Sequence, residues 1–376
     1  MKKMIKYCII VALCISNYYP VCSTQEKDTK NIKEADIVEK YTFPDEKSEH
    51  EGTWLQWPHG YTYGEDYRKE IEHIWIEMTA ALSEAEKVHV VTYNQTEKER
   101  VSKILQNQGI NMNMIDFFIV PFDDVWARDN GPIFVYDQHK NLKIWAPKFN
   151  GWGEKTPFEK DASLRECLSK ELKLERIDMR LVIEGGAIEL DGNGTFLSTR
   201  SAVMNENRNP GLSDAEIEKY LSSLGVTNFI WLDGVHGADI TDFHIDGFAK
   251  FYDKNTIITF SENDLAEWGL SAKDIKTLLS VKNASGESYK HVFLPLSKNK
   301  VTLVNGEALD YKGSYANFYI GNKVVLVPNY NDSNDIIAND IIQKLYPGRK
   351  VFGIDVRELY KDGGMIHCVT QQQPAI

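Results

Sequence analysis

The sequence predicts an α/β fold built from repeated units arranged around a centre. Strand and helix patterns alternate beyond residue 45, and a hairpin pattern recurs. Successive hairpin turns are marked by asparagines 52, 62 and 67 residues apart, at Asn141, Asn193, Asn255 and Asn322. Periods of this length are typical of repeat architectures. They favour one radially arranged domain over two independent domains.

Each predicted unit contains a hairpin, a helix and a further strand. Apolar runs around Asp-Gly or Gly-Asn turns are hairpin signals. They predict hairpins over 133–147, 187–198, 247–260 and 317–327. Helical patterns follow over 161–174, 213–224, 262–279 and 334–345.

The chain before the first of these hairpins follows the same alternation. Strands are predicted over 52–58, 88–93 and 117–120, and helices over 65–86 and 96–106. The first of these strands stops at a proline. The longer helix carries an apolar face made of Ile71, Ile74, Trp75, Met78 and Leu82.

Composition is that of an ordinary globular protein. The 376 residues are 42% apolar and 26% charged, which is enough for a large core. The net charge of −12 argues against a nucleic-acid surface and favours cationic ligands.

Residues 1–23 are predicted to be a signal peptide. Lys2, Lys3 and Lys6 precede a short apolar run at 8–15, which is too brief to span a bilayer comfortably. Cleavage is expected before Thr24, leaving a charged linker over 24–40 and no stable membrane insertion. The protein is therefore expected to be exported to a periplasmic or extracellular space. Lipidation of Cys22 is the less favoured alternative.

Cysteine usage focuses attention on the C-terminus. Three of the five cysteines lie in the leader, which leaves Cys167 and Cys368. Two cysteines do not make a disulfide scaffold, and a bridge between them would consume the second as a nucleophile. Cys167 lies in a helical pattern and is expected to pack there.

The last turn of the chain is the most informative stretch. Gly363 and Gly364 allow a close approach of the backbone, and Cys368 follows in the sequence His-Cys-Val-Thr-Gln-Gln-Gln-Pro. We interpret Cys368 as a nucleophile that this loop delivers into a pocket. The alternative is a small buried hydrophobic residue, which is the commonest role of an unbridged cysteine.

Other polar residues gather where the predicted hairpins begin. Residues 123–132 carry three acids, an arginine and Trp126, which could wall a planar cation. Glu184 precedes two glycines. A strand is expected over 239–246, which would place His244 and Asp246 on the same side.

Three chemistries compete for these residues. A metal site could use His244, Asp246, His367 and Cys368, but no paired Cys or His spacing supports it. A Cys-His-Asn acyl hydrolase leaves the surplus carboxylates unexplained. A planar guanidinium matches carboxylates two at a time. Each carboxylate would attract it by about 4 kcal/mol at ~4 Å and an effective dielectric of about 20, before desolvation.

The motifs together identify a family. WARDNGP, EGG, DGNGT, NRNP, SYANFY and GGMIHCVTQQQP resemble the agmatine deiminase and bacterial peptidylarginine deiminase branch of the guanidino-group-modifying superfamily. The resemblance runs from about residue 41 to the end, so 41–376 is expected to be the deiminase catalytic domain. It implies a five-bladed, pseudo-symmetric α/β propeller with ββαβ-type repeats and no cofactor or metal.

The resemblance also implies roles for particular residues. Cys368 would be the nucleophile and His244 the general acid and base, while Asp129 and Asp246 would grip the guanidinium. The residues expected to bind substrate are Trp126, Glu184, Asn317 and Asp242. Agmatine would give N-carbamoylputrescine and ammonia, and peptidyl-arginine would give citrulline.

Two departures from the family pattern leave alternatives open. Phe243 stands where the family usually has glycine, so it could fill the pocket. Ile240 stands where many agmatine deiminases have an acid. Arg200 and Arg208 are the candidates for holding the carboxylate of a peptide. An agmatine deiminase, an exported peptidylarginine deiminase and an impaired binding protein on the same scaffold all remain, each compatible with a homodimer.

Overall fold

The structure is a computed structural model that describes residues 39–376. The predicted signal peptide and all but the last two residues of the predicted linker lie outside the described residues. Mixed sheets and helices make up the described part, which confirms the α/β class. Within residues 39–376, no helix is long and apolar enough to cross a membrane.

Five of the sheets share one strand order, in which two antiparallel strands are followed by a third that lies parallel to the second. The sheets are β18 (Gln371–Pro374), β1 (His50–Gln56), β2 (Lys87–Thr92); β4 (Ile133–Tyr136), β5 (Leu142–Lys148), β6 (Arg176–Val182); β7 (Glu189–Leu190), β8 (Thr195–Thr199), β9 (Asn228–Leu232); β10 (Lys250–Asp253), β11 (Thr256–Phe260), β12 (Lys290–Leu294); and β15 (Tyr319–Ile320), β16 (Val324–Asn329), β17 (Lys350–Asp355). This repetition confirms the predicted hairpins.

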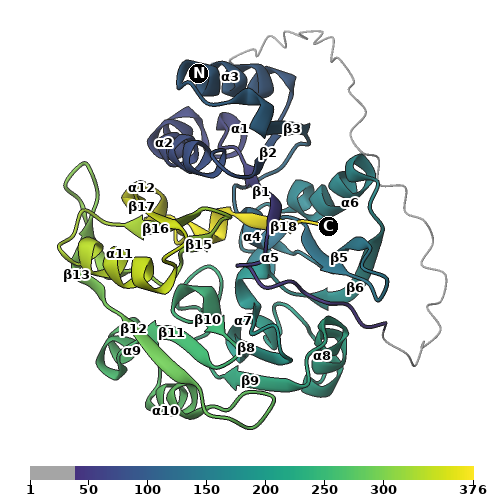
Figure 1. Cartoon of the computed structure of the whole chain (residues 1–376), viewed down its shortest axis with the longest axis vertical. Helices are drawn as coiled ribbons and strands as arrows, with labels where there is room; N and C mark the ends of the chain where they lie inside the picture. Colours follow the sequence, from purple (N-terminus) through teal and green to yellow (C-terminus); the bar gives the residue numbers. More distant parts are fainter. Residues whose placement is uncertain (1–38) are drawn as a thin grey trace, which may run out of the picture. The chain divides into compact units, whose positions relative to one another are not determined.

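The first sheet joins the two ends of the described chain. Strand β18 pairs with β1, and β3 (Ile115–Ile119) adds a fourth strand beyond β2 (Figure 1). The indole of Trp54 in β1 donates to the Gln373 side chain at 2.9 Å. The amide-rich tail is thus a paired strand, and this pairing anchors the loop that carries Cys368.

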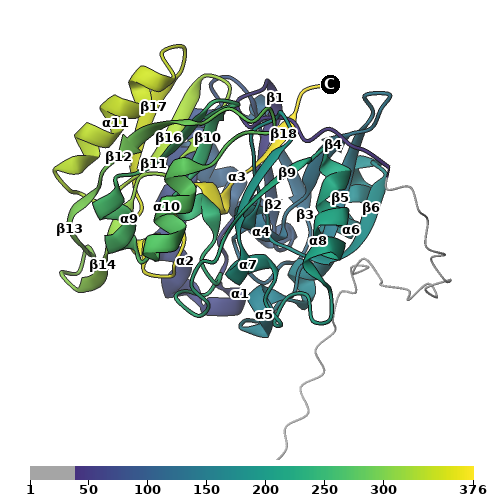
Figure 2. The same cartoon turned by 90° about the horizontal axis from the view of Figure 1, so that it is seen from below.

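Helices connect the second strand of each of these sheets to the third. These are α2 (Glu65–Leu82), α6 (Glu159–Leu172), α8 (Asp214–Leu221), α9 (Glu262–Trp268) with α10 (Ala272–Ser280), and α11 (Asn334–Leu345). Helix α6 lies against β5 and β6 (Figure 2). The remaining helices are α1 (Gly60–Tyr63), α3 (Gln95–Asn107), α4 (Ala127–Asn130), α5 (Gly151–Glu154), α7 (Arg200–Val203) and α12 (Arg357–Tyr360), and short 3-10 turns are η1 (Met112–Met114), η2 (Gly185–Ala187), η3 (Ser222–Leu224), η4 (Ile245–Gly247) and η5 (His367–Val369).

Two predicted helices differ in the structure, and one sheet is additional. The helix expected over 65–86 ends at Leu82, although its apolar face is buried as predicted. The helix expected over 262–279 is two helices, because Gly269 adopts φ +108° and Ser271 caps the second one. A two-stranded sheet, β13 (Leu296–Thr302) with β14 (Ala308–Ser314), was not predicted.

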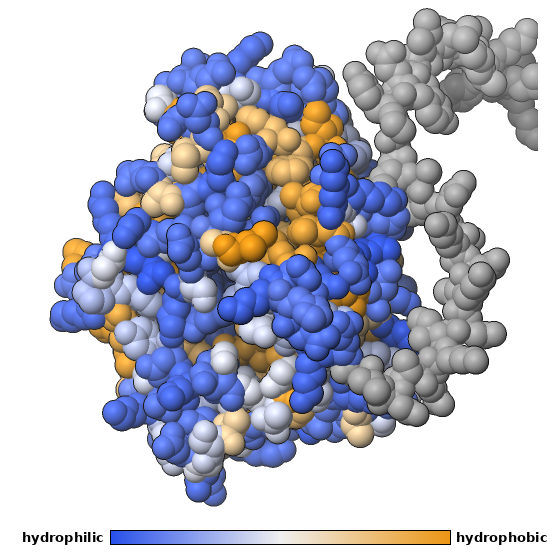
Figure 3. Space-filling model, turned by 45° about the vertical axis from the view of Figure 1, so that its right-hand side comes forward, coloured by the Kyte–Doolittle hydropathy of each residue, from blue (hydrophilic) through white to orange (hydrophobic). Residues whose placement is uncertain are grey.

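Apolar side chains are buried in two clusters. The larger one includes the face of α2 and the central strands β11 and β16, and the smaller one surrounds β8 and α8. The face seen in Figure 3 is mostly hydrophilic, with apolar residues exposed in separate patches.

Candidate active site

The predicted functional residues lie at equivalent places in the repeated sheets. Each precedes the first strand of a sheet: Asp129 before β4, Glu184 before β7, His244 and Asp246 before β10, Asn317 before β15, and Cys368 before β18. The sequence pattern of polar residues at hairpin starts therefore marks a single structural position.

The segment that carries His244 is not the predicted strand. Asp242 and Phe243 adopt φ values of +61° and +78°, and η4 follows. The Asp239 carboxylate accepts from the backbone N–H of Thr241 and of Phe243, at 2.7 and 3.2 Å, and holds this turn. Two consecutive residues in the left-handed region cannot continue a strand. The same φ explains why glycine suits position 243.

Three site groups converge on Gly186. A Cβ placed there would lie 2.5 Å from His244 Nδ1, 2.9 Å from Asp129 Oδ1 and 3.1 Å from Asp246 Oδ2. The Gly186 N–H donates to Asp129 Oδ1 at 2.9 Å. Only glycine at position 186 allows this approach. A Cβ at the preceding Gly185 would lie 2.1 Å from the Arg128 carbonyl oxygen, so both glycines after Glu184 are required.

His244 is surrounded by carboxylates. Its Nε2 lies 3.2 Å from Glu184 Oε2 and its Nδ1 lies 3.8 Å from Asp129 Oδ1. Burial lowers the pKa of His244, but the charges of Asp129, Glu184 and Asp246 outweigh burial and raise it to about 9. The imidazole is therefore protonated at neutral pH and can donate a proton.

Cys368 lies against an amide and a carboxylate. Its Sγ is 3.4 Å from Asn317 Nδ2 and 3.8 Å from Asp246 Oδ2. Asn317 is itself fixed by donating to the Asp246 backbone carbonyl at 3.1 Å. Burial, followed by the charges of Asp246 and Asp129, raises the pKa of the thiol well above its ordinary value.

Asp242 occupies a different position from the expected one. Its carboxylate is fully buried and accepts from Arg208 Nη1 at 3.2 Å and Lys155 Nζ at 2.7 Å. Arg208 also donates from Nε to Glu184 Oε1 at 2.6 Å. Asp242 does not line the cavity beside Cys368, and Arg208 is a buried link between two acids instead of a surface carboxylate binder. Arg200 pairs with Asp214.

Tryptophans support the site from outside the cavity lining. Trp126 packs against Gly364, where a Cβ would lie 2.0 Å from the indole, so it shapes the loop that carries Cys368. Trp152, which sequence reasoning missed, donates from Nε1 to Asp129 Oδ2 at 2.8 Å.

A cavity of about 560 Å³ opens beside Cys368. Its lining includes Cys368, His244, Asp246 and Asn317, and Phe243 forms part of its wall. The Phe243 ring packs against Phe248, with ring centres 5.3 Å apart, so it leaves this space open. The rest of the lining comes largely from residues 238–241, the end of α9, β13, β14 and residues 360–365, and includes Trp268, Tyr311, Tyr360, Asp239, Asp310, Asp362, Lys300 and Lys312.

His367 and Glu46 were not predicted as a pair. His367 Nδ1 lies 2.8 Å from Asp246 Oδ2, and its Nε2 lies 2.8 Å from Glu46 Oε2. The sequence alone offered only the His367-Cys368 neighbourhood as a signal. Among residues 39–376, no group of three or more His, Cys, Asp or Glu side chains is arranged to hold a metal ion.

Known proteins share this fold and this length. Residues 42–374 match the model of the Porphyromonas-type peptidyl-arginine deiminases. A Selenomonas ruminantium protein provisionally named an agmatine deiminase is 30% identical, over 89% of this chain and 96% of its own length. The solved agmatine deiminase of Enterococcus faecalis is 27% identical with a TM-score of 0.77, over 89% of this chain and 96% of its own. An agmatine deiminase of C. jejuni, solved with substrate bound, is 29% identical with a TM-score of 0.77, over 89% of this chain and 96% of its own.

These comparisons define the class of protein as the deiminases, hydrolases of guanidino C–N bonds. The chain belongs to the Porphyromonas-type peptidyl-arginine deiminase family.

Proposed function

We propose that this protein deiminates agmatine, giving N-carbamoylputrescine and ammonia, through a covalent intermediate on Cys368. The observation that carries this proposal is the convergence of Asp129, Asp246 and His244 on Gly186, beside a cavity that Asp246, His244 and Cys368 line. Two buried carboxylates and a thiol suit a planar cation whose central carbon is attacked.

Asp129 and Asp246 are the guanidinium ligands in this proposal. Asp246 is ionised, since His367 holds its pKa below the ordinary value despite burial. Glu184 orients His244, and Asn317 orients Cys368. Trp126 contributes through its packing on Gly364.

The reaction follows from these positions. The Cys368 thiolate attacks the guanidinium carbon, and His244 protonates the leaving nitrogen, which departs as ammonia. The resulting S-alkylthiouronium is then attacked by water, and His244 takes the proton of that water. The C–S bond then breaks, which regenerates Cys368 and releases the ureido product.

Thiolate formation is coupled to substrate binding. The raised pKa of Cys368 keeps the empty site in the thiol form. A bound guanidinium would neutralise the two acids that cause part of this shift, and an opposite charge favours ionisation. The protein therefore generates its nucleophile when the cation is present.

The cavity favours a substrate with a second cation. Asp239 and Asp362 are exposed carboxylates among its lining residues, whereas Asp310 pairs with Lys300 at 3.4 Å. Such charges attract the terminal amine of agmatine. Peptidyl-arginine is the second candidate, because a volume of about 560 Å³ exceeds the needs of so small an amine.

The wider organisation belongs to the same proposal. The five sheets with one strand order are the five blades of an α/β propeller, closed where β18 pairs with β1. Residues 41–376 form the catalytic domain. Residues 1–23 direct export, and the mature protein acts outside the cytoplasm as a monomer or a homodimer.

Ammonia release from agmatine, free arginine and an arginine peptide tests the function. Turnover of agmatine that is lost in Cys368→Ala and kept in Cys167→Ala supports the proposal, since Cys167 lies buried on α6. Turnover of the peptide alone would assign the second candidate. A folded protein that releases ammonia from none of the three would refute all of these substrates.

A further inference from the structure

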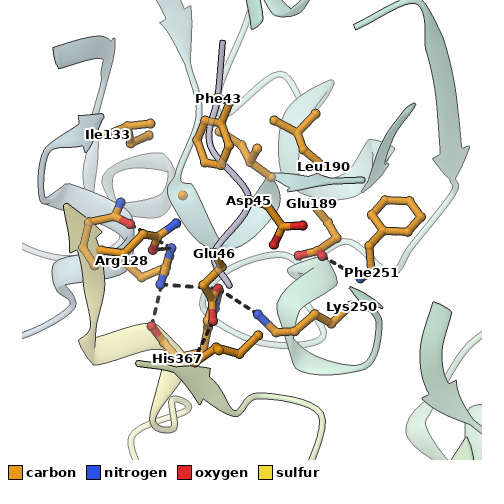
Figure 4. A pocket seen from close by; sticks show the side chains of 15 residues that line it. Phe43, Asp45, Glu46, Arg128, Ile133, Glu189, Leu190, Lys250, Phe251 and His367 are labelled. Carbon is orange, nitrogen blue, oxygen red and sulfur yellow. Dashed lines mark hydrogen bonds and ion pairs between the residues drawn. The ribbon is translucent and has the colours of Figure 1, made fainter. Parts of the chain in front are cut away.

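A second, small cavity of about 40 Å³ lies next to His367 (Figure 4). Its ionisable lining residues are Asp45, Glu46, Arg128, Glu189, Lys250 and His367. His367 lines this cavity, whereas Cys368, the next residue, lines the large one. The two cavities are therefore connected through one peptide unit and the contacts of the His367 ring.

Glu46 is the centre of this charged cluster. Its Oε2 lies 2.8 Å from His367 Nε2 and accepts from Lys250 Nζ at 2.9 Å, while its Oε1 accepts from the Ile320 N–H at 2.9 Å. Burial opposes ionisation of Glu46, but the charges of Lys250 and His367 hold its pKa well below the ordinary value. Glu46 is a buried carboxylate anion.

The hydrogen bonds of His367 determine its protonation. Both ring nitrogens lie 2.8 Å from carboxylate oxygens, those of Asp246 and Glu46. An ionised carboxylate only accepts hydrogen bonds, so each ring nitrogen has to donate. His367 is therefore an imidazolium between two anions.

The positive ring lies close to the reactive sulfur. Asp246 Oδ2 is 2.8 Å from His367 Nδ1 and 3.8 Å from Cys368 Sγ. One oxygen is thus shared between the cation and the thiol. The ring charge offsets the effect of Asp246 on the sulfur, and an offset of this kind favours thiolate.

We propose that Glu46 is a positioning residue that keeps His367 cationic and, through His367 and Asp246, makes the Cys368 thiol easier to ionise. This inference rests on the proposed function and deepens it. It adds to the site a residue, Glu46, that lies far from Cys368 in the sequence. Glu46 touches neither Cys368 nor the cavity beside it; its influence passes through the ring of His367.

Other charged groups face the same cluster. Arg128 Nε donates to the His367 carbonyl at 3.3 Å, and its Nη2 lies 3.9 Å from Glu46 Oε2. Burial raises the pKa of Glu189 to about 8, although Lys250 lowers it. Glu189 therefore titrates within the range of the experiment, so each pH profile is also recorded with Glu189→Gln.

Glu46→Gln is the sharpest test because it can replace an accepting carboxylate oxygen by a donating amide NH₂ group. Glu46 Oε1 accepts from the Ile320 N–H and Oε2 accepts from Lys250 Nζ. With Lys250→Met added, the new amide NH₂ takes the position of Oε2 and faces His367 Nε2. That nitrogen must then accept, which makes the ring neutral with its proton on Nδ1. The double variant Glu46→Gln, Lys250→Met removes both members of the buried ion pair. It therefore leaves no unpaired buried lysine charge that could destabilise the fold. Asp45→Asn is the matched control, since Asp45 pairs with Lys47 at 3.1 Å instead.

Three measurements on the full-length protein test the contacts from Glu46 through His367 and Asp246 to Cys368. In Glu46→Gln combined with Lys250→Met, the Nε2–H resonance of His367 disappears and its Nδ1–H resonance stays, whereas Lys250→Met alone keeps both. Alkylation of Cys368 by iodoacetamide, followed by mass spectrometry of its peptide, shifts to higher pH by about one unit. Turnover of the accepted substrate falls about tenfold in kcat at neutral pH, with KM changed less than about twofold, because Asp246 stays in place.

Each outcome decides the inference. A double variant that keeps both ring N–H resonances and the wild-type alkylation profile would overturn it and leave Glu46 a packing residue. A higher KM at unchanged kcat would also overturn it, since displacement of Asp246 would then be the cause. If the resonance and alkylation shifts occur but no substrate is turned over even by the wild type, the inference stands and the proposed function fails.

Discussion

The left-handed backbone of Phe243 predicts an unusual order of stability for two substitutions at this position. Phe243 is 6% exposed and adopts φ +78°. Truncating a buried phenylalanine to alanine costs about 3–5 kcal/mol of unfolding free energy. A left-handed backbone costs a residue with a Cβ about 1–2 kcal/mol, which glycine avoids. We therefore expect Phe243→Ala to be destabilised by about 3–5 kcal/mol, and Phe243→Gly by about 1–2 kcal/mol less.

This order reverses the usual one, in which glycine is the worse residue by about 0.5–1 kcal/mol. Urea denaturation of the two variants, monitored by circular dichroism, measures the difference. Phe248, which packs against Phe243, provides the control: at its φ of −148°, Phe248→Gly should be the less stable of its own pair with Phe248→Ala. If Phe243→Gly were no more stable than Phe243→Ala, the assigned backbone strain would be refuted.

The same variant tests whether the Phe243 ring obstructs the cavity. An increase of more than about tenfold in deiminase activity on Phe243→Gly would show that it does, contrary to the wall position described above.

Three further predictions concern the groups around His244. Gly186→Ala should keep the fold and lower kcat/KM by about 100-fold or more, because its Cβ would overlap the His244 ring; steady-state kinetics beside a thermal melt checks this. The pKa of His244 is raised to about 9, so its protonation stabilises the folded protein by at most about 3 kcal/mol. This stabilisation is complete below pH ~6.5 and is lost as the pH rises through about 9. Urea titrations and initial-rate profiles should therefore show both stability and kcat falling over that window. Arg208→Met should destabilise the protein by about 3–5 kcal/mol, since it removes the buried cation that Glu184 Oε1 and Asp242 share. Arg200→Met at an exposed ion pair should cost under about 1 kcal/mol by the same urea assay.

Much of the fold was accessible from local sequence signals. Hairpin turns and helical periodicity depend on residues within a few positions of one another, so the antiparallel strand pairs and α11 were predicted nearly to their ends. The break at Gly269 was available in principle, since glycine followed by Ser271 is a stop and a cap. The hairpin β13–β14 was missed because its strands are mostly polar and exposed and lack an apolar alternation.

The site was predicted as a set of residues but not as a geometry. Cys368, His244, Asp246 and Asn317 do line one cavity. Their grouping came from motif resemblance, because their separations along the chain exceed any local rule. Asp242 shows the limit: the sequence cannot tell which of two acids beside a histidine faces the cavity when the backbone reverses between them at positive φ.

The sequence by itself determined which elements form, which hairpins repeat, and which residue types are available for guanidine chemistry, because these depend on composition and short-range order. Only the tertiary structure decided the pairing of β18 with β1, the burial of Arg208 between two acids, and the contact of Glu46 with His367. These are contacts between residues 24 to more than 300 positions apart. Their energies depend on burial and on distances of a few ångströms, and a linear pattern contains neither.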